Sequence, residues 1–313
     1  MQQTDKTLRG VALMLTFCVI APLIDVASKL AAAEVTVGVV TLSRFVVQAA
    51  LMLPVALIMK ERLALPRGTF WLSMARAVVS ILATFCFIAA LRFMPIADAL
   101  VIVFVEPFII LLIGWLVLGE HVGPRRLIAC LVGFLGCIVV IRPSFAVFGS
   151  VALFPLGTAL FFAIYILITR SLSRRINPVP MQFHTAFFAA ILCMPLFLLG
   201  PALNEPSLNF VWPQGIFWLW CFCVGLAATV SHMAMTYALK YAPSSTLAPL
   251  HYSEIVTATI FSYMVFGDFP DLIRWVGIAI IVGSGLYIIA REHKLSKIAN
   301  RPLKDELPLP EAP

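Results

Sequence analysis

Residues 90–143 and 238–291 of this chain are two versions of one sequence, and both are almost entirely apolar. The segment Ala90-Leu91-Arg92-Phe93-Met94-Pro95 aligns with Ala238-Leu239-Lys240-Tyr241-Ala242-Pro243 at an offset of 148 residues. Continued without a gap, the same offset pairs Glu106 with Glu254, Gly119-Glu120 with Gly267-Asp268, and Arg126 with Arg274. A duplicated apolar chain of this kind predicts a membrane protein built from two repeats.

The apolar residues are gathered into ten runs, each a candidate transmembrane helix. The chain is 62% hydrophobic and only 12% charged, whereas soluble domains carry about 25% charged residues. With a rise of about 1.5 Å per residue, roughly 20 apolar residues cross the hydrocarbon core of a bilayer. We therefore expect an all-α membrane protein with ten transmembrane helices, at approximately 9–31, 37–59, 70–90, 96–118, 125–142, 150–169, 180–200, 215–239, 245–266 and 272–290.

The sequence contains no signature of a cofactor or metal site. All seven cysteines lie inside the apolar runs without Cys-x-x-Cys spacing, so we expect them to pack as small apolar side chains. The Walker A, GxGxxG and HExxH motifs do not occur, and the connections leave no room for a soluble catalytic domain. We predict neither a cofactor nor a metal ion.

The basic residues are distributed unevenly between the two sides of the predicted membrane. Cytoplasmic loops are enriched in Lys and Arg, and with a cytoplasmic N-terminus sixteen basic residues fall inside and three fall outside. The net charge of +7 is therefore a topology signal that places both termini in the cytoplasm, and it does not indicate nucleic-acid binding. The inside residues are Lys6, Arg9, Lys60, Arg62, Arg67, Arg125, Arg126, Arg170, Arg174, Arg175, Arg274, Arg291, Lys294, Lys297, Arg301 and Lys304; the outside residues are Arg92, Arg142 and Lys240.

The ten spans divide into two halves of five, residues 1–145 and 146–292. Because five is odd, the first span of each half must cross the membrane in the opposite sense. The halves are therefore predicted to be inverted repeats, related by a pseudo-two-fold axis in the membrane plane. Residues 293–313 are rich in proline and charge and lack an apolar surface, so we expect a disordered cytoplasmic tail.

Six charged residues lie inside the predicted spans and away from their ends, where a charge costs from about 3 to more than 10 kcal/mol and is a functional candidate by default. Three are acidic and three basic, which indicates a polar interior rather than charges facing lipid. Asp25 and Lys29 are spaced to pair along the first span. They are followed by Arg44 in the second span, Arg76 in the third, Glu106 in the fourth and Glu254 in the ninth.

The two glutamates are the strongest site candidates. Glu106 precedes Pro107, which removes a helix hydrogen bond and frees a carbonyl oxygen near a carboxylate. Glu254 is the repeat equivalent and ends the polar run His251-Tyr252-Ser253-Glu254. If both face a central cavity, two like charges with little solvent favour retaining one proton, so the pair could exchange it as access alternates. A purely structural role remains open, with Glu106 paired to Arg44 or Arg76.

The remaining candidates are assigned by their place in the spans. Arg44, with Gln48 one turn on, is expected to point inward and to bind a carboxylate, phosphate or planar polar group. Arg76 lies seven residues into its span, so its side chain also has a structural interpretation, reaching to the membrane surface. Tyr252 is expected to stack on the substrate and His251 to bind it. His184 and His232 are interpreted as hydrogen-bonded core residues.

The repeated segments resemble the EamA family of the drug/metabolite transporter superfamily. The resemblance rests on residues 90–99, on the next span with Pro107 inside it, on Leu116-Val117-Leu118-Gly119-Glu120, and on the second copy from Ala238 to Gly267-Asp268. It extends over about residues 5–292. It implies a ten-helix transporter whose central cavity is formed by the first four helices of each repeat. Glu106 before the proline and the His-Tyr-Ser-Glu run are not general features of that family.

On this resemblance, we expect a secondary transporter of a small metabolite in the bacterial inner membrane. The family includes uptake systems for riboflavin and S-adenosylmethionine and exporters of amino acids and metabolites; riboflavin uptake is the first hypothesis and the others are alternatives. An intramembrane enzyme is the alternative of a different class, since Gly283-Ser284-Gly285 resembles a nucleophile elbow, but its strand–turn–helix context is lacking. The expected partners are the substrate and membrane lipids, with no nucleic acid. A homodimer through the glycine-rich fifth and tenth spans stays open.

Overall fold

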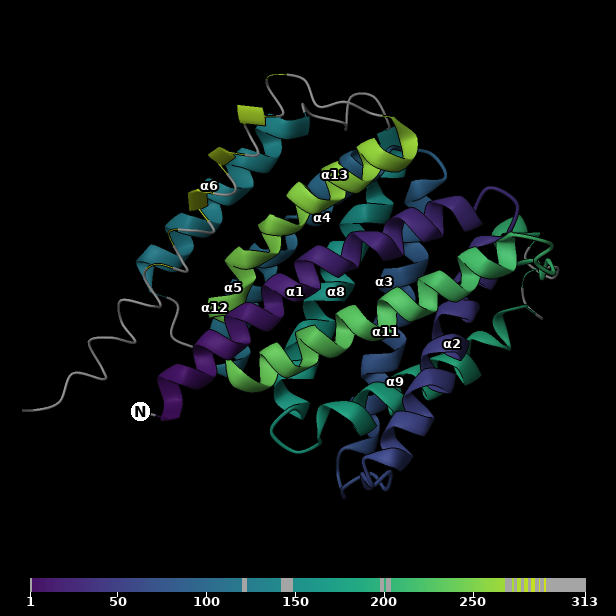
Figure 1. The fold of residues 1–313 in the computed structure, drawn as a ribbon, viewed down its shortest axis with the longest axis horizontal. Coiled ribbons are helices and arrows are strands. Elements are labelled where there is room, and N and C mark those ends of the chain that lie inside the picture. Colours follow the sequence, from purple (N-terminus) through teal and green to yellow (C-terminus); the bar gives the residue numbers. More distant parts are fainter. Residues whose placement is uncertain are drawn as a thin grey trace, which may run out of the picture.

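The computed structural model describes residues 2–119, 123–141, 149–197, 200, 204–267 and helical residues scattered between 272 and 290. Every regular element in this part of the chain is a helix (Figure 1). The predicted tail, 293–313, lies outside the described residues. The elements are α1 (Gln2–Ala31), α2 (Val37–Ile58), α3 (Phe70–Leu91), α4 (Ile96–Val103), α5 (Glu106–Leu118), α6 (Pro124–Ile141), η1 (Gly149–Ala152), α8 (Leu153–Leu172), α9 (Pro178–Cys193), η2 (Pro206–Leu208), α11 (Phe217–Tyr241), α12 (Ser244–Leu247), η3 (Ala248–Ser253) and α13 (Glu254–Phe266).

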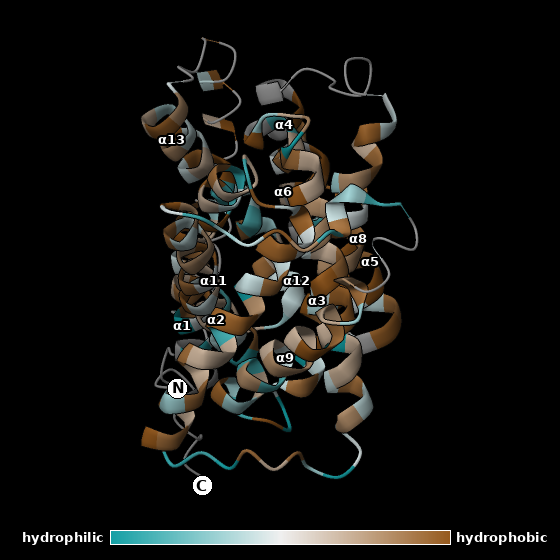
Figure 2. Ribbon diagram, turned by 90° about the vertical axis from the view of Figure 1, so that its right-hand side faces the viewer, coloured by the Kyte–Doolittle hydropathy of each residue, from teal (hydrophilic) through white to brown (hydrophobic). Residues whose placement is uncertain are grey.

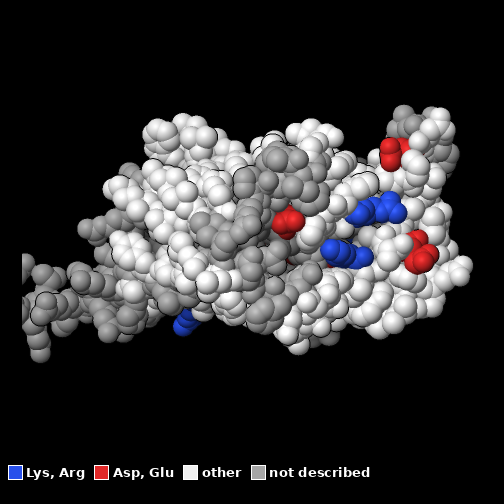
Figure 3. Space-filling model, turned by 90° about the horizontal axis from the view of Figure 1, so that it is seen from above, with Lys and Arg blue, Asp and Glu red and all other residues white. Residues whose placement is uncertain are grey.

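Five helices of the described chain are long and apolar enough to cross a membrane. They correspond to α1, α2, α3, α8 (with η1) and α11, and span 22 to 26 residues each. Apolar residues predominate along the helices in Figure 2, and charged side chains are sparse on the face in Figure 3. The chain is therefore a membrane protein. The other five predicted crossings are shorter, broken or incompletely described, so the number ten stays a prediction.

The fourth and ninth predicted spans are each broken just before their glutamate, whereas the sequence predicted continuous helices. Glu106 is the first residue of α5, after the end of α4, and Glu254 is the first residue of α13, after η3. Pro107 suits this place, because the first turn of a helix does not use its backbone N–H groups. Both helices end at a glycine with positive φ, 63° at Gly119 and 79° at Gly267. The two repeats thus place a glutamate at the start of equivalent half-helices.

Helices of the two halves pack in pairs, and the pairs remain the same when each helix is replaced by its equivalent in the other repeat. α1 packs along α11, and the equivalent pair, α8 with α3, also packs together. α2 packs on α9, its own equivalent in the second half, and α13 contacts α1 as α5 contacts α8. Figure 1 shows α1 and α11 side by side through the middle of the bundle. These matching pairs are the contacts expected of two repeats related by a pseudo-two-fold axis.

Hydrogen bonds between loops define the two ends of the bundle. At one end, which we call the basic end, the loops at 59–69 and 173–177 meet the end of α11. There the amide of Asn177 donates to the carboxylate of Glu61 at 3.0 Å, and Nε2 of His184 lies 2.7 Å from the carbonyl oxygen of Leu63. At the opposite end, the hydroxyl of Thr36 donates to the carbonyl oxygen of Asn209 at 2.8 Å. The basic end carries Lys60, Arg62, Arg67, Arg174 and Arg175.

The structure corrects one assignment in the topology prediction. Lys240 was expected outside, but its Nζ donates to Oδ1 of Asn177 at 3.0 Å, so it lies at the basic end. Arg170 lies there too, since its Nη1 donates to the carbonyl oxygen of Leu239 at 2.6 Å. In an inverted repeat, Arg92 and its equivalent Lys240 must lie at opposite ends. Arg274, the repeat equivalent of Arg126, lies outside the described residues.

Candidate functional site

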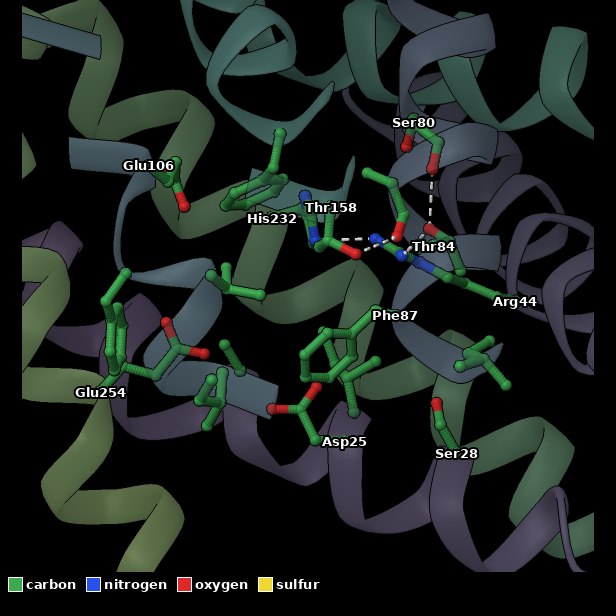
Figure 4. Close-up of a pocket in the computed structure, with 18 residues that line it drawn as sticks. Asp25, Ser28, Arg44, Ser80, Thr84, Phe87, Glu106, Thr158, His232 and Glu254 are labelled. Carbon is green, nitrogen blue, oxygen red and sulfur yellow. Dashed lines mark hydrogen bonds between the residues drawn. The ribbon is translucent and has the colours of Figure 1, made fainter. Parts of the chain in front are cut away.

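A cavity lies between the two repeats, with a volume of about 720 Å³ when the open space at its mouth is included. It is nearer to the end opposite the basic end, because α1 and α3 line it with residues 21–28 and 80–88, close to where both helices finish. Figure 4 shows side chains from both repeats pointing into it. Its polar and charged residues are Asp25, Ser28, Arg44, Ser80, Thr84, Glu106, Thr158, His232 and Glu254, and its aromatic residues are Phe87, Phe104 and Phe162.

Three carboxylates line this cavity. Asp25, Glu106 and Glu254 are exposed by only 8%, 2% and 9%, and all three carboxylates point into the common space in Figure 4. Glu106 and Glu254 begin α5 and α13, where backbone N–H groups and the helix dipole favour a negative charge. Oδ2 of Asp25 and Oε1 of Glu106 have no hydrogen-bond partner among the described residues. The cavity wall thus carries three buried carboxylates, whose like charge a proton or a cation would offset.

Glu106 lies beside His251 and not beside an arginine. Nδ1 of His251 is 3.1 Å from Oε1 of Glu106, a close approach whose angles do not make a hydrogen bond. The imidazole ring also packs 5.5 Å from the ring of Phe17 and 6.3 Å from that of Phe162, measured between centroids. The structural alternative that paired Glu106 with Arg44 or Arg76 is therefore wrong, because both guanidinium groups have other partners.

Arg44 is the one guanidinium on the cavity wall among the described residues. Its Nη1 donates to the hydroxyl of Thr84, and its Nη2 lies 2.8 Å from Nε2 of His232. A guanidinium only donates, so Nε2 of His232 must accept, and Nδ1 carries the ring proton. Nδ1 in turn lies 3.2 Å from the hydroxyl of Tyr165. Nε of Arg44 is buried and has no hydrogen-bond partner among the described residues.

Arg76 is fully buried but does not line the cavity. Its Nε donates to the hydroxyl of Thr169 at 2.7 Å, and its Nη2 donates to the hydroxyl of Tyr165 at 2.6 Å and to Oε1 of Gln182 at 3.0 Å. Its Nη1 donates to the hydroxyl of Thr185 and to the carbonyl oxygen of Met181. The interpretation that placed its side chain at the membrane surface is wrong, since it is 0% exposed.

Three other candidates from the sequence also lie off the cavity wall. Tyr252 is 0% exposed and packs against the ring of Phe104, with 5.6 Å between centroids, and against Gly133 of α6. It is therefore a packing residue in this structure and does not present a stacking face. Lys29 is only partly buried, with its Nζ 5.1 Å from the centre of the Phe266 ring. His251 does not line the cavity itself but contacts two residues that do, Glu106 and Phe162.

Several residues of the cavity wall were not predicted from the sequence. His232 was interpreted as a core group, and Ser80, Thr84 and Phe162 were not singled out. One signal was present: extended backward, the offset of 148 aligns Thr84 with His232, and these two residues hold Arg44 from equivalent helices. Hydroxyl and aromatic residues are common in membrane spans, so nothing else in the sequence marks them.

Comparison with known proteins confirms the resemblance. The model of the EamA-like transporter family matches residues 8–142 and again residues 149–290. The chain belongs to this family. A riboflavin transporter of Rhizobium johnstonii is 29% identical over 71% of this chain and 71% of its own length. A riboflavin transporter of Brucella anthropi is 24% identical over 91% of this chain and all of its own length. An S-adenosylmethionine uptake transporter of Rickettsia bellii is 26% identical over 64% of this chain and 66% of its own length.

A solved crystal structure supports the fold alone. It superposes with a TM-score of 0.72 at 19% sequence identity and covers 94% of this chain and 99% of the other. With the family match and the named relatives, the EamA chain is a membrane transporter of a metabolite. The substrate is a separate question, because relatives of similar identity carry names with different substrates.

Proposed function

We propose that this EamA chain is a secondary carrier that takes up riboflavin across the bacterial inner membrane by alternating access. The observation that carries the proposal is the cavity between the repeats, which combines aromatic rings with hydrogen-bonding groups around one volume. Riboflavin has a flat ring with carbonyl groups along its edge and a hydroxyl-rich side chain. The names of two relatives, one of them matched over its full length, support this substrate.

The wall of the cavity suits such a molecule in chemical terms. Phe87, Phe104 and Phe162 provide apolar faces for a flat ring. Arg44 lines the cavity, and the planar set of donors of a guanidinium suits ring carbonyl oxygens. Cavities that bind small molecules combine an apolar lining with a few placed polar groups in this way.

The three carboxylates provide a means of coupling transport to a cation. A proton or another small cation bound among Asp25, Glu106 and Glu254 offsets their like charge in a cavity with little solvent. Glu106 and Glu254 stand where their half-helices begin, so a movement of α5 or α13 changes the surroundings of the carboxylate. Broken helices that meet near the centre of the bundle are the usual place for coupling ions in transporters built from inverted repeats.

One observation favours a second candidate, S-adenosylmethionine. Three carboxylates stand against one guanidinium on the cavity wall, which favours a ligand carrying positive charge. The sulfonium and ammonium groups of S-adenosylmethionine suit the acids, its carboxylate suits Arg44, and its adenine suits the aromatic rings. In that case the acids bind the substrate itself, whereas with riboflavin they serve the coupling cation.

Flux into liposomes separates the two candidates. Purified protein is reconstituted, and entry of riboflavin, of S-adenosylmethionine and of a mixture of amino acids is compared with entry into protein-free liposomes. We expect riboflavin to enter faster with the protein, and unlabelled riboflavin to compete where S-adenosylmethionine does not. Entry of S-adenosylmethionine alone establishes the second candidate instead, and entry of neither contradicts the proposal.

A further inference from the structure

Arg76 has every one of its donors satisfied by neutral groups. A guanidinium has five N–H donors, and Arg76 directs them at Thr169, Tyr165, Gln182, Thr185 and the carbonyl oxygen of Met181. Its guanidinium carbon also lies 4.4 Å from the centre of the Tyr165 ring. These bonds join α3 to α8 and α9. A buried charge that is held by neutral groups does not by itself indicate a stabilising role. The position of this cluster in the fold is therefore more informative than the strength of its hydrogen bonds.

This cluster lies between the cavity and the basic end. On α3, Arg76 precedes the residues that line the cavity, which begin at Ser80. On α8, the cavity-lining residues are Thr158 and Phe162, and Thr169 follows them toward the end of the helix. The partners on α9 occupy its first two turns, next to the loop at the basic end. Apolar side chains fill the same level on α1 and α11: Met14, Phe17, Met235 and Leu239 are all exposed by 2% or less.

Among the residues that the structure describes, the cluster has no counterpart in the other repeat. The offset of 148, extended through α3 and α11, aligns Arg76 with Val224. Tyr165 and Thr169 align with Asp25 and Lys29 at the looser offset of 140 that relates α1 to α8. If the cluster only supported packing between repeats, the pseudo-two-fold axis would favour one at each end. Among the described residues the cluster is present at one end alone. This asymmetry is expected of a contact that stabilises one of the two alternating states of a carrier.

We propose that Arg76 and its partners on α8 and α9 are a lock that closes the cavity toward the basic end, and that the lock must open for the substrate to leave there. The inference rests on the proposed function as an alternating-access carrier. Tyr165 connects the lock to the cavity, because its hydroxyl contacts both Arg76 and His232, and His232 contacts Arg44. A ligand that accepts hydrogen bonds from Arg44 competes with His232 for these donors. Because His232 also contacts Tyr165, such a ligand acts on a residue next to the lock.

Accessibility of a cysteine in the cavity tests the lock without any substrate. Ser80→Cys is introduced into a protein whose native cysteines are replaced, and a membrane-impermeant thiol reagent is added to oriented vesicles from either side. In the reference protein we expect modification mainly from the side opposite the basic end. Tyr165→Phe and Thr185→Val each remove one acceptor of Arg76, and each should raise the rate from the basic side about tenfold, the shift expected for one hydrogen bond to a charged group. Arg76→Gln should raise it further.

Two matched controls separate the lock from general loosening. Arg92→Gln changes an exposed arginine just beyond the other end of α3. Tyr237→Phe removes a hydroxyl on α11 that is not among the hydrogen-bond partners of Arg76. Both should leave the rates unchanged. Unchanged access from the basic side in folded Tyr165→Phe and Thr185→Val overturns the lock, whether or not Arg76→Gln folds. Equal increases from both sides also overturn it. Because no substrate is present, a failure of riboflavin flux contradicts the proposed function and leaves this result standing.

Discussion

Gly133→Ala tests the packing of α6 against the broken ninth span. An ideal Cβ at Gly133 overlaps Cδ2 of Tyr252 and lies 2.9 Å from Cε2 of the same ring. Carbon atoms normally meet at about 3.5–4.0 Å, so the gap must widen by about 1 Å or more. The ring cannot easily turn away, because Tyr252 is 0% exposed and packs on Phe104. Overpacking of this kind costs about 1–3 kcal/mol.

The same substitution should also disturb transport, since Tyr252 belongs to η3, between His251 and the start of α13 at Glu254. We expect the melting temperature of the purified protein in detergent to fall by roughly 2–10 °C. Gly283→Ala is the matched control, because a Cβ there meets nothing within 4 Å in the described structure, and it should be neutral. Equal melting temperatures for the two variants refute the packing argument.

Two further predictions concern the cavity and the membrane topology. Arg44→Lys keeps the charge but loses the forked contact to Thr84 and His232, so the affinity for the substrate should fall about tenfold. The affinity is measured from the concentration dependence of uptake, and the yield of folded protein should not change. Unchanged affinity contradicts a binding role of Arg44. A cysteine in place of Arg174, at the basic end, should resist an external impermeant reagent in intact cells, whereas one in place of Glu205 should react. External labelling at residue 174 contradicts the ten-span topology.

The sequence predicted the charged residues of the cavity wall better than the neutral ones. Asp25, Arg44, Glu106 and Glu254 stand out because a charge inside an apolar run is costly, and all four line the cavity. Charge alone does not tell which way a side chain points. Arg76 lies on α3 as Ser80 and Thr84 do, but it is outside the cavity, because only the packing of neighbouring helices determines which face of a helix meets which neighbour.

The broken spans show a second limit. Pro107 indicated a disturbed helix, but the sequence did not predict that Glu106 and Glu254 would each begin a new one. The 3-10 helix η3 has about 3.0 residues per turn, where an α-helix has 3.6. Residues before Glu254 therefore point in directions that α-helical spacing does not give. Tyr252, expected to face the substrate, faces α6 for this reason.

The most direct test of the transport site compares Glu106→Gln with Asp98→Asn. Glu106 is buried on the cavity wall, whereas Asp98 lies in the first turn of α4, is partly buried and does not line the cavity. The measurement is the initial rate of riboflavin entry into proteoliposomes under an imposed proton gradient, with equal amounts of folded protein. We expect Glu106→Gln to lower the rate at least about tenfold, as for the loss of a charge-assisted interaction, and Asp98→Asn to change it little. Equal rates for the two variants would contradict a transport site at Glu106.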